Sequence, residues 1–226
     1  MNQDIVHVYF MPGMAANPSI FEHIKLPKHQ FEIHWLEWLI PETDESLSNY
    51  ALRLTKGIKH DKVALIGVSF GGIVVQEMSK HIPLVRLIII SSVKSKNELP
   101  KRLKFMRITK GYNLIPTSII NNIDFLAKYA FGETVKKRVE LYKKYLSITD
   151  PKYLNWAIKE MVNWNQVKSA QNLIHIHGSD DHVFPYKYIQ NCITVENGTH
   201  IMVLNKYRWF NKHLPKLILE GTDPTC

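Results

Sequence analysis

Short, almost continuously apolar stretches recur along the chain, and each of them predicts a β-strand. They are rich in valine and isoleucine, and polar or turn-forming residues bound them. Near-continuous hydrophobicity is typical of strands that are covered on both faces of a sheet. The predicted strands span residues 4–10, 31–38, 62–67, 85–91, 172–178 and 192–197.

Between these strands, apolar residues at three- and four-residue spacings predict helices. The clearest patterns cover residues 46–58, 71–82 and 205–221, and Pro215 should kink or divide the last of them. Alternation of strands and helices is typical of a parallel sheet with helices on both faces. We therefore predict an α/β fold with a doubly wound, mainly parallel sheet.

This alternation stops after LIIISSV, which ends at residue 93, and the strand pattern resumes at Asn172. The pattern in between is helical, over residues 99–112, 117–131, 132–148 and 151–164. An all-helical insertion between two strands of one sheet is the simplest explanation. The predicted division is a core of residues 1–94 and 169–226 with a helical insertion at 95–168.

Size and charge fit this division. The 226 residues and 45% hydrophobic content suit one core with an insertion. Residues 94–168 contain 16 Lys and Arg against 6 Asp and Glu, whereas the rest of the chain contains 13 against 14. Solvated helix faces explain this excess, and attraction of an anionic substrate, a phospholipid surface or an acidic carrier protein is the alternative. No nucleic-acid-binding motif accompanies the charge, so we expect no nucleic-acid partner.

Other features of the sequence disfavour several classes of protein. Cys192 and Cys226 give no disulfide framework, which favours a reducing compartment. With no secretory signal and no apolar stretch near the roughly 18 residues of a membrane span, we expect a cytoplasmic protein. The 11 histidines form no HExxH motif and the cysteines lack ligand spacing, so no metal site is predicted. A G-x-G-x-x-G sequence is missing, and we expect no cofactor.

The candidate chemistry begins at the hexapeptide GVSFGG, residues 67–72, at the end of a predicted strand. Gly67 and Gly71 lie two residues on either side of Ser69, and glycine leaves room for a very tight strand-to-helix turn. Such a turn can hold a serine in a strained backbone conformation with its hydroxyl exposed, as in a nucleophile elbow. In the alternative interpretation, Ser69 caps the following helix.

Polar residues follow two further predicted strands. The segment HGSDDHVFP, residues 177–185, comes after the fifth strand, and NGTH, which ends at His200, comes after the sixth. Ligands of open parallel sheets bind at the carboxyl ends of the strands. Serine, aspartate and histidine occupy these ends in the chain order of an α/β-hydrolase site. The sequence therefore predicts a Ser-His-Asp site at this edge of the sheet.

With these motifs, essentially the whole chain resembles the α/β-hydrolase superfamily in its smaller form with a helical lid. The family segment H-G-x-x-D-x-x-V/I-P aligns with HGSDDHVFP, which places the acid at Asp181, with Asp180 as the competitor. By the same alignment His177 is a structural histidine and His182 a loop residue.

The resemblance implies a role for each residue of the site. Ser69 would be the nucleophile, His200 its general base and acid, and Asp181 the group that orients the imidazole. An oxyanion hole would consist of the backbone N–H groups of Phe70 and of Met14, the latter in the loop after the first strand. This loop departs from the family, because Pro12-Gly13 stands where His-Gly is usual. A backbone donor needs no particular side chain, so Met14 is still the expected second donor.

We interpret the chain as a serine hydrolase that cleaves a carboxylic ester with a small or medium apolar acyl group. A thioester of an anionic carrier is the main alternative, and amide, lactone and carbon–carbon bonds stay open because the same triad serves them all. A slow-turnover ligand receptor, and weak attachment of the basic lid to an anionic membrane or carrier, are the remaining hypotheses. Among the tryptophans, Trp156 and Trp164 are the candidates to face the pocket.

Overall fold

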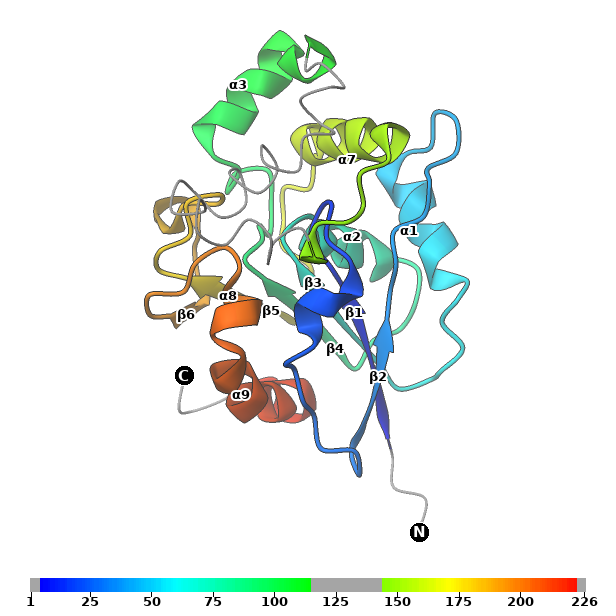
Figure 1. Ribbon diagram of the computed structural model, residues 1–226, viewed down its shortest axis with the longest axis vertical. Coiled ribbons are helices and arrows are strands. Elements are labelled where there is room, and N and C mark those ends of the chain that lie inside the picture. Colours follow the sequence, from blue (N-terminus) through cyan, green and yellow to red (C-terminus); the bar gives the residue numbers. More distant parts are fainter. Residues whose placement is uncertain (1–4, 115–143, 223–226) are drawn as a thin grey trace.

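The computed structural model describes residues 5–114 and 144–222. Its centre is a sheet of six strands in the order β2-β1-β3-β4-β5-β6, and every neighbouring pair is parallel (Figure 1). The strands are β1 (Val6–Met11), β2 (Phe31–Trp35), β3 (Val63–Val68), β4 (Arg86–Ile90), β5 (Leu173–Gly178) and β6 (Ile193–Val195). The prediction of a parallel sheet is confirmed, and each predicted strand is present.

Helices cover both faces of the sheet (Figure 1). α1 (Leu47–Thr55) and α2 (Phe70–Met78) pack against each other on one face, and α9 (Tyr207–Glu220) lies on the other. α1 begins after Ser46, whose side chain accepts a hydrogen bond from the Asn49 N–H. The doubly wound arrangement predicted from the alternation of elements is therefore confirmed.

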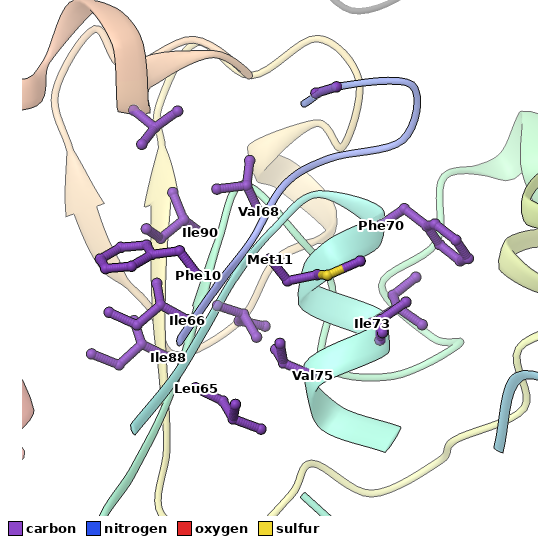
Figure 2. Close-up of a cluster of buried hydrophobic side chains, with 14 of the residues drawn as sticks. Phe10, Met11, Leu65, Ile66, Val68, Phe70, Ile73, Val75, Ile88 and Ile90 are labelled. Atoms are coloured by element: carbon purple, nitrogen blue, oxygen red, sulfur yellow. The ribbon is translucent and has the colours of Figure 1, made fainter. Parts of the chain in front are cut away.

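The core is deepest around β3 and α2. All six residues of β3 and all nine residues of α2 are buried. Successive strand residues point to opposite faces, so Leu65 lies toward Val75 of α2, whereas Ile66 packs beside Ile88 on the other face (Figure 2). Both ends of the β3–α2 turn are thereby anchored in close-packed core.

The predicted strand at 31–38 is longer than β2, which ends at Trp35. Beyond that point the chain leaves the sheet and runs beside the loop that follows β1. There the indole N–H of Trp38 donates to the carbonyl oxygen of Gly13 at 3.1 Å. A side-chain contact with another loop thus replaces continued pairing with β1.

Pro215 does not divide the C-terminal helix. The predicted helix at 205–221 corresponds to α9, which runs through Pro215 without a break, and the short α8 (Met202–Asn205) precedes it. Proline lacks an N–H, so the helix loses one backbone hydrogen bond at this position. Leu214 and Leu217 are fully buried on either side of it, and their packing holds the helix together.

The structure describes only part of the predicted insertion at 95–168. That part contains α3 (Lys101–Thr109), the 3₁₀ turn η2 (Gly111–Leu114) and α7 (Pro151–Asn163). The helix expected at 117–131 and most of the one expected at 132–148 lie outside the described residues. The division into core and lid therefore stays a prediction. None of the helices in 5–114 and 144–222 is long and apolar enough to cross a membrane.

Candidate active site

Ser69 occupies a strained turn between β3 and α2. Its φ of 54° and ψ of −122° are values that a residue with a side chain rarely adopts. The Ser69 side chain makes no capping hydrogen bond to α2. The interpretation of Ser69 as a helix cap is therefore wrong, and its hydroxyl is turned toward other partners.

The flanking glycines are required by the backbone around this turn. A Cβ atom on Gly67 would lie 2.3 Å from the carbonyl oxygen of Gly71, and one on Gly71 would lie 2.2 Å from that of Pro12. No side chain fits at such distances. The hydroxyl of Ser92 fastens the same turn by donating to the carbonyl oxygen of Ser69 at 2.7 Å.

The structure brings the three predicted polar residues into one hydrogen-bonded chain. Ser69 Oγ lies 2.9 Å from His200 Nε2, and His200 Nδ1 lies 2.9 Å from Asp181 Oδ2. Asp181 follows β5 and His200 follows β6, so three strand ends supply the chain. Because an ionised carboxylate only accepts hydrogen bonds, Nδ1 carries the proton and Nε2 faces the serine as an acceptor.

Asp181 is a buried carboxylate with several donors. Its Oδ1 accepts the backbone N–H groups of Val183 at 2.8 Å and Phe184 at 2.9 Å. Burial acts to raise the pKa of Asp181, but the facing His200 and the hydrogen bonds outweigh it and hold this pKa below its ordinary value. Asp181 is thus ionised at neutral pH and fixed in position.

The competing acid, Asp180, points away from the site. Its side chain is 57% exposed and lies 3.2 Å from His182 Nε2, which is itself exposed. His177, by contrast, is fully buried, and its Nε2 donates to the carbonyl oxygen of Phe184 at 2.8 Å. This bond braces the loop that carries Asp181.

The loop after β1 approaches Ser69 closely. A Cβ atom on Gly13 would lie 3.3 Å from Ser69 Cβ. Met14 lines the same pocket as Ser69 and His200, and Ala15 turns the loop with a φ of 63°. Met14 therefore lies in a loop segment that borders the pocket at Ser69. Phe70, the other predicted donor, is the first residue of α2.

Trp38 orients this loop, which the sequence did not indicate. The Gly13 carbonyl accepts hydrogen bonds from Trp38 Nε1 at 3.1 Å and from the Ala16 N–H at 3.0 Å. In a trans peptide the C=O of Gly13 and the N–H of Met14 point in opposite directions, so holding one fixes the other. The Trp38 ring also stacks on Phe70, with centroids 5.5 Å apart. One side chain thus contacts both predicted donor segments.

An apolar pocket opens beside the hydroxyl. Ser69 and His200 are part of its wall, and no Lys, Arg, Asp or Glu is among the described residues that line it. The apolar wall comes from the segment after β1, the described part of the predicted insertion, the loop after β5 and the segment from His200 through α8. It includes Met14, Ile20, Leu146, Met161, Phe184 and Val203.

Solved structures of other proteins match this arrangement over nearly the whole chain. A hydrolase from Pseudomonas aeruginosa PA01 has a TM-score of 0.70 and 16% identity, over 97% of this chain and 91% of that one. A thermophilic esterase from Thermogutta terrifontis has a TM-score of 0.66 and 13% identity, with coverages of 96% and 90%. A bromoperoxidase from Bacillus anthracis has a TM-score of 0.66 and 16% identity, with coverages of 96% and 93%. The chain has the α/β-hydrolase fold.

No protein-family model and no curated protein matches the sequence. At such low identities the solved structures share an architecture with this chain, and their names include both an esterase and a bromoperoxidase. An α/β-hydrolase fold supports many reactions, so the activity must be argued from the site.

The two tryptophans of the insertion do not face the pocket of this α/β-hydrolase fold. Trp156 donates from Nε1 to the carbonyl oxygen of Glu45 at 2.7 Å, and Trp164 donates to Glu77 Oε1 at 2.8 Å. Both are buried in the core, and neither lines the pocket. The indole N–H groups are satisfied by α1 and α2 segments, which fixes both rings away from Ser69.

Proposed function

We propose that this protein is a serine hydrolase that cleaves a carboxylic ester through an acyl-serine intermediate. The hydrogen-bonded chain Ser69–His200–Asp181, set in a strained turn beside an apolar pocket, carries the proposal. A serine hydroxyl is a weak nucleophile, and an adjacent base with an orienting carboxylate is the arrangement that activates it.

In the first half of the reaction, Ser69 Oγ attacks the ester carbonyl carbon while His200 Nε2 takes the hydroxyl proton. The tetrahedral intermediate collapses when the imidazolium returns this proton to the leaving alcohol oxygen, which leaves an acyl group on Ser69. A water molecule then attacks the acyl carbon, His200 takes its proton, and the proton passes to Ser69 Oγ as the acid departs. Asp181 stabilises the imidazolium in both halves.

The negative charge of each tetrahedral intermediate needs donors that are already in place. We assign this role to the backbone N–H groups of Phe70, the residue after Ser69, and of Met14, in the loop whose Gly13 approaches Ser69. One such donor is commonly worth about 10²–10³ in kcat. The hydrogen bond from Trp38 to the Gly13 carbonyl would hold the Met14 peptide in one orientation for this role.

The pocket supports an uncharged, apolar acyl group as the substrate class. An anionic acyl chain would need a cation to offset the loss of hydration, and the described part of the lining offers none. The basic residues of the insertion that the structure describes lie outside this lining, so they would act on the leaving group or on the surroundings instead. Basic residues outside the pocket could attract an anionic leaving group, so a thioester of an anionic carrier is the alternative substrate to an ester.

Turnover of a chain-length series of p-nitrophenyl esters and of the matching acyl thioesters tests the proposal. We expect hydrolysis of short to medium neutral acyl esters by the wild type and its loss in Ser69→Ala. Equal activity of Ser69→Ala would contradict the nucleophile assignment. A clear preference for thioesters would keep the mechanism and replace the ester as substrate. Stoichiometric binding of the acyl compounds with negligible turnover would favour a ligand receptor.

A further inference from the structure

A second cluster of polar side chains lies at the opposite, amino-terminal end of the sheet. His7 of β1 is in register with Val63 at the start of β3, whereas Ser69 follows the end of that strand. His34 belongs to β2, the edge strand, and His60 to the loop before β3 (Figure 1). At about 3.3 Å per strand residue, the cluster is roughly 20 Å from Ser69 along the strands.

The three imidazoles meet at close range. One nitrogen from each ring can be chosen so that all three lie within 4.8 Å of one another. His7 Nδ1 is 3.0 Å from His34 Nε2, and the His60 ring stacks on the His7 ring with centroids 3.5 Å apart. Burial lowers the pKa of His7 and of His34, and the nearby His60 lowers both further while Glu32 raises them. The neutral imidazole that this favours is the form that binds metals.

Glu32 adds a carboxylate to the same place. It is paired in register with His7, and it shares a face of β2 with His34, two residues further on. Its oxygens lie 3.6 Å from His7 Nδ1 and 3.7 Å from His34 Nε2. A tetrahedral zinc ion separates two of its ligand atoms by roughly 3.4 Å. The three short distances in this group are therefore close to those of a metal coordination shell.

We propose that His7, His34, His60 and Glu32 form a binding site for a divalent transition-metal ion of the zinc type. Three imidazole nitrogens and one carboxylate oxygen form a donor set that binds zinc in preference to the hard cations calcium and magnesium. Tyr9 supports the set, because its hydroxyl lies 2.7 Å from His60 Nδ1 and leaves Nε2 of that ring for the ion.

The geometry also says which ligand must move. A bound ion lies near the plane of each imidazole ring that coordinates it. The His7 and His60 rings are nearly parallel with centroids 3.5 Å apart, so no single ion position lies in the plane of both. His60 therefore tilts out of its stack when the ion binds, while His7, His34 and Glu32 stay close to their positions. The ion would join β1, the edge strand β2 and the loop before β3, so its effect is on stability rather than on the reaction at Ser69.

Calorimetric titration of chelator-treated protein with Zn²⁺ tests this site, with Co²⁺ absorption as a second measurement. We expect one ion per chain with a Kd below about 1 µM, the visible bands of four-coordinate Co²⁺, and a Tm that rises by roughly 5–10 °C at 100 times Kd. His7→Gln and His34→Gln should each weaken binding at least about 100-fold, and Tyr9→Phe about 10-fold or more.

Two control variants separate this site from other histidines. His81→Gln removes an exposed imidazole, and His200→Ala removes the one beside Ser69; both should bind zinc as the wild type does. The proposal is overturned if the wild type binds no stoichiometric ion, if its Co²⁺ spectrum is six-coordinate, or if His7→Gln and His34→Gln keep the wild-type affinity. If the circular dichroism spectrum shows that a glutamine variant does not fold, the zinc affinity of Tyr9→Phe and the Co²⁺ spectrum of the wild type test the proposal in its place.

Discussion

The two ends of the sheet carry two different kinds of polar cluster. At the carboxyl end, Asp181 is 2% exposed and His200 is 7% exposed, and Ser69 is held at a positive φ. At the amino end, the side chain of Glu32 is 57% exposed and the histidines are only half-buried. In the first cluster each side chain is hydrogen-bonded to the next, whereas in the second the ring nitrogens of His7 and His34 lie 3.0 Å apart with the His60 ring stacked beside them.

The two clusters are therefore suited to different kinds of chemistry. At the carboxyl end, the buried carboxylate of Asp181 and the strained backbone of Ser69 both cost free energy of folding. Such costs are tolerated where the surrounding packing, here the core around β3 and α2, fixes the arrangement. Preorganised groups of this kind suit chemistry on a bound substrate. The imidazoles of the amino-end cluster are only half-buried, so less packing opposes the tilt that binding of an ion would require.

The largest expected effect that separates the clusters is that of Ser69→Ala. Loss of the nucleophile should lower kcat by about 10⁶-fold, because the remaining members of a triad cannot act without it. Zinc affinity at the amino end should stay unchanged, since the two clusters share no residue. Steady-state kinetics checks the loss of kcat, and calorimetry on the same preparation checks the zinc affinity. A parallel loss of activity and zinc binding would mean that the clusters are not independent.

The next effect distinguishes two adjacent carboxylates. Asp181→Asn should lower kcat by about 10⁴-fold, because the amide cannot hold His200 in the required tautomer. Asp180→Asn is the matched control and should change kcat less than about twofold, because it removes only an exposed pairing with His182 that is worth little. Kinetics of both variants on one ester decide the matter, and the reverse ranking would move the acid to Asp180.

A smaller effect is expected where the carboxyl-end cluster depends on a positioning residue. Trp38→Phe keeps an aromatic ring against Phe70 but removes the N–H that holds the Gly13 carbonyl. Since the lost contact acts through the Met14 peptide, kcat should fall about 10-fold with KM nearly unchanged. Trp209→Phe, a tryptophan of α9, controls for loss of an indole. Equal kcat values for the two variants would remove Trp38 from the positioning role.

The smallest effect compares His34 of the amino-end cluster with His175, a buried histidine of β5 whose Nε2 lies 3.2 Å from His177 Nδ1. Burial, with the adjacent His177, holds the pKa of His175 well below its ordinary value, and burial also lowers that of His34. Below about pH 6.5 the unfolded chain therefore binds protons that the folded chain does not, and stability falls as the pH drops. Each such histidine contributes at most about 1.4 kcal/mol per pH unit.

Denaturant unfolding between pH 7.5 and about 5 measures these slopes. His175→Gln should flatten the dependence more than His34→Gln, because His175 is 3% exposed whereas the His34 side chain is 22% exposed. If the two variants keep the same slope as the wild type, neither histidine is held neutral by the fold.

The carboxyl-end cluster could be predicted from the sequence, because a local pattern marks each of its parts. Ser69 stands between glycines that the turn requires, and Asp181 and His200 come within five residues of the ends of β5 and β6. The role of Trp38 was not predictable, because it depends on how the segment after β2 lies against another loop. The expectation that Pro215 would divide the last helix failed for a similar reason: packing on both sides of it outweighs one missing hydrogen bond.

The amino-end cluster left no such trace in the sequence. His7, His34 and His60 are separated by more than 20 residues and match no metal-binding spacing, so the sequence predicted no metal site. Strand register alone brings them together, since His7 and Glu32 pair across β1 and β2 and side chains two apart share a face. Register follows from the whole sheet, and no local pattern reports it.

Reaction of the purified protein with a fluorophosphonate probe tests the activated serine most directly. The geometry of Ser69 and His200 predicts one label per chain, located by mass spectrometry on the peptide that contains Ser69 and absent from Ser69→Ala. No labelling of the folded wild-type protein, or labelling that persists in Ser69→Ala, would contradict a nucleophile at this position.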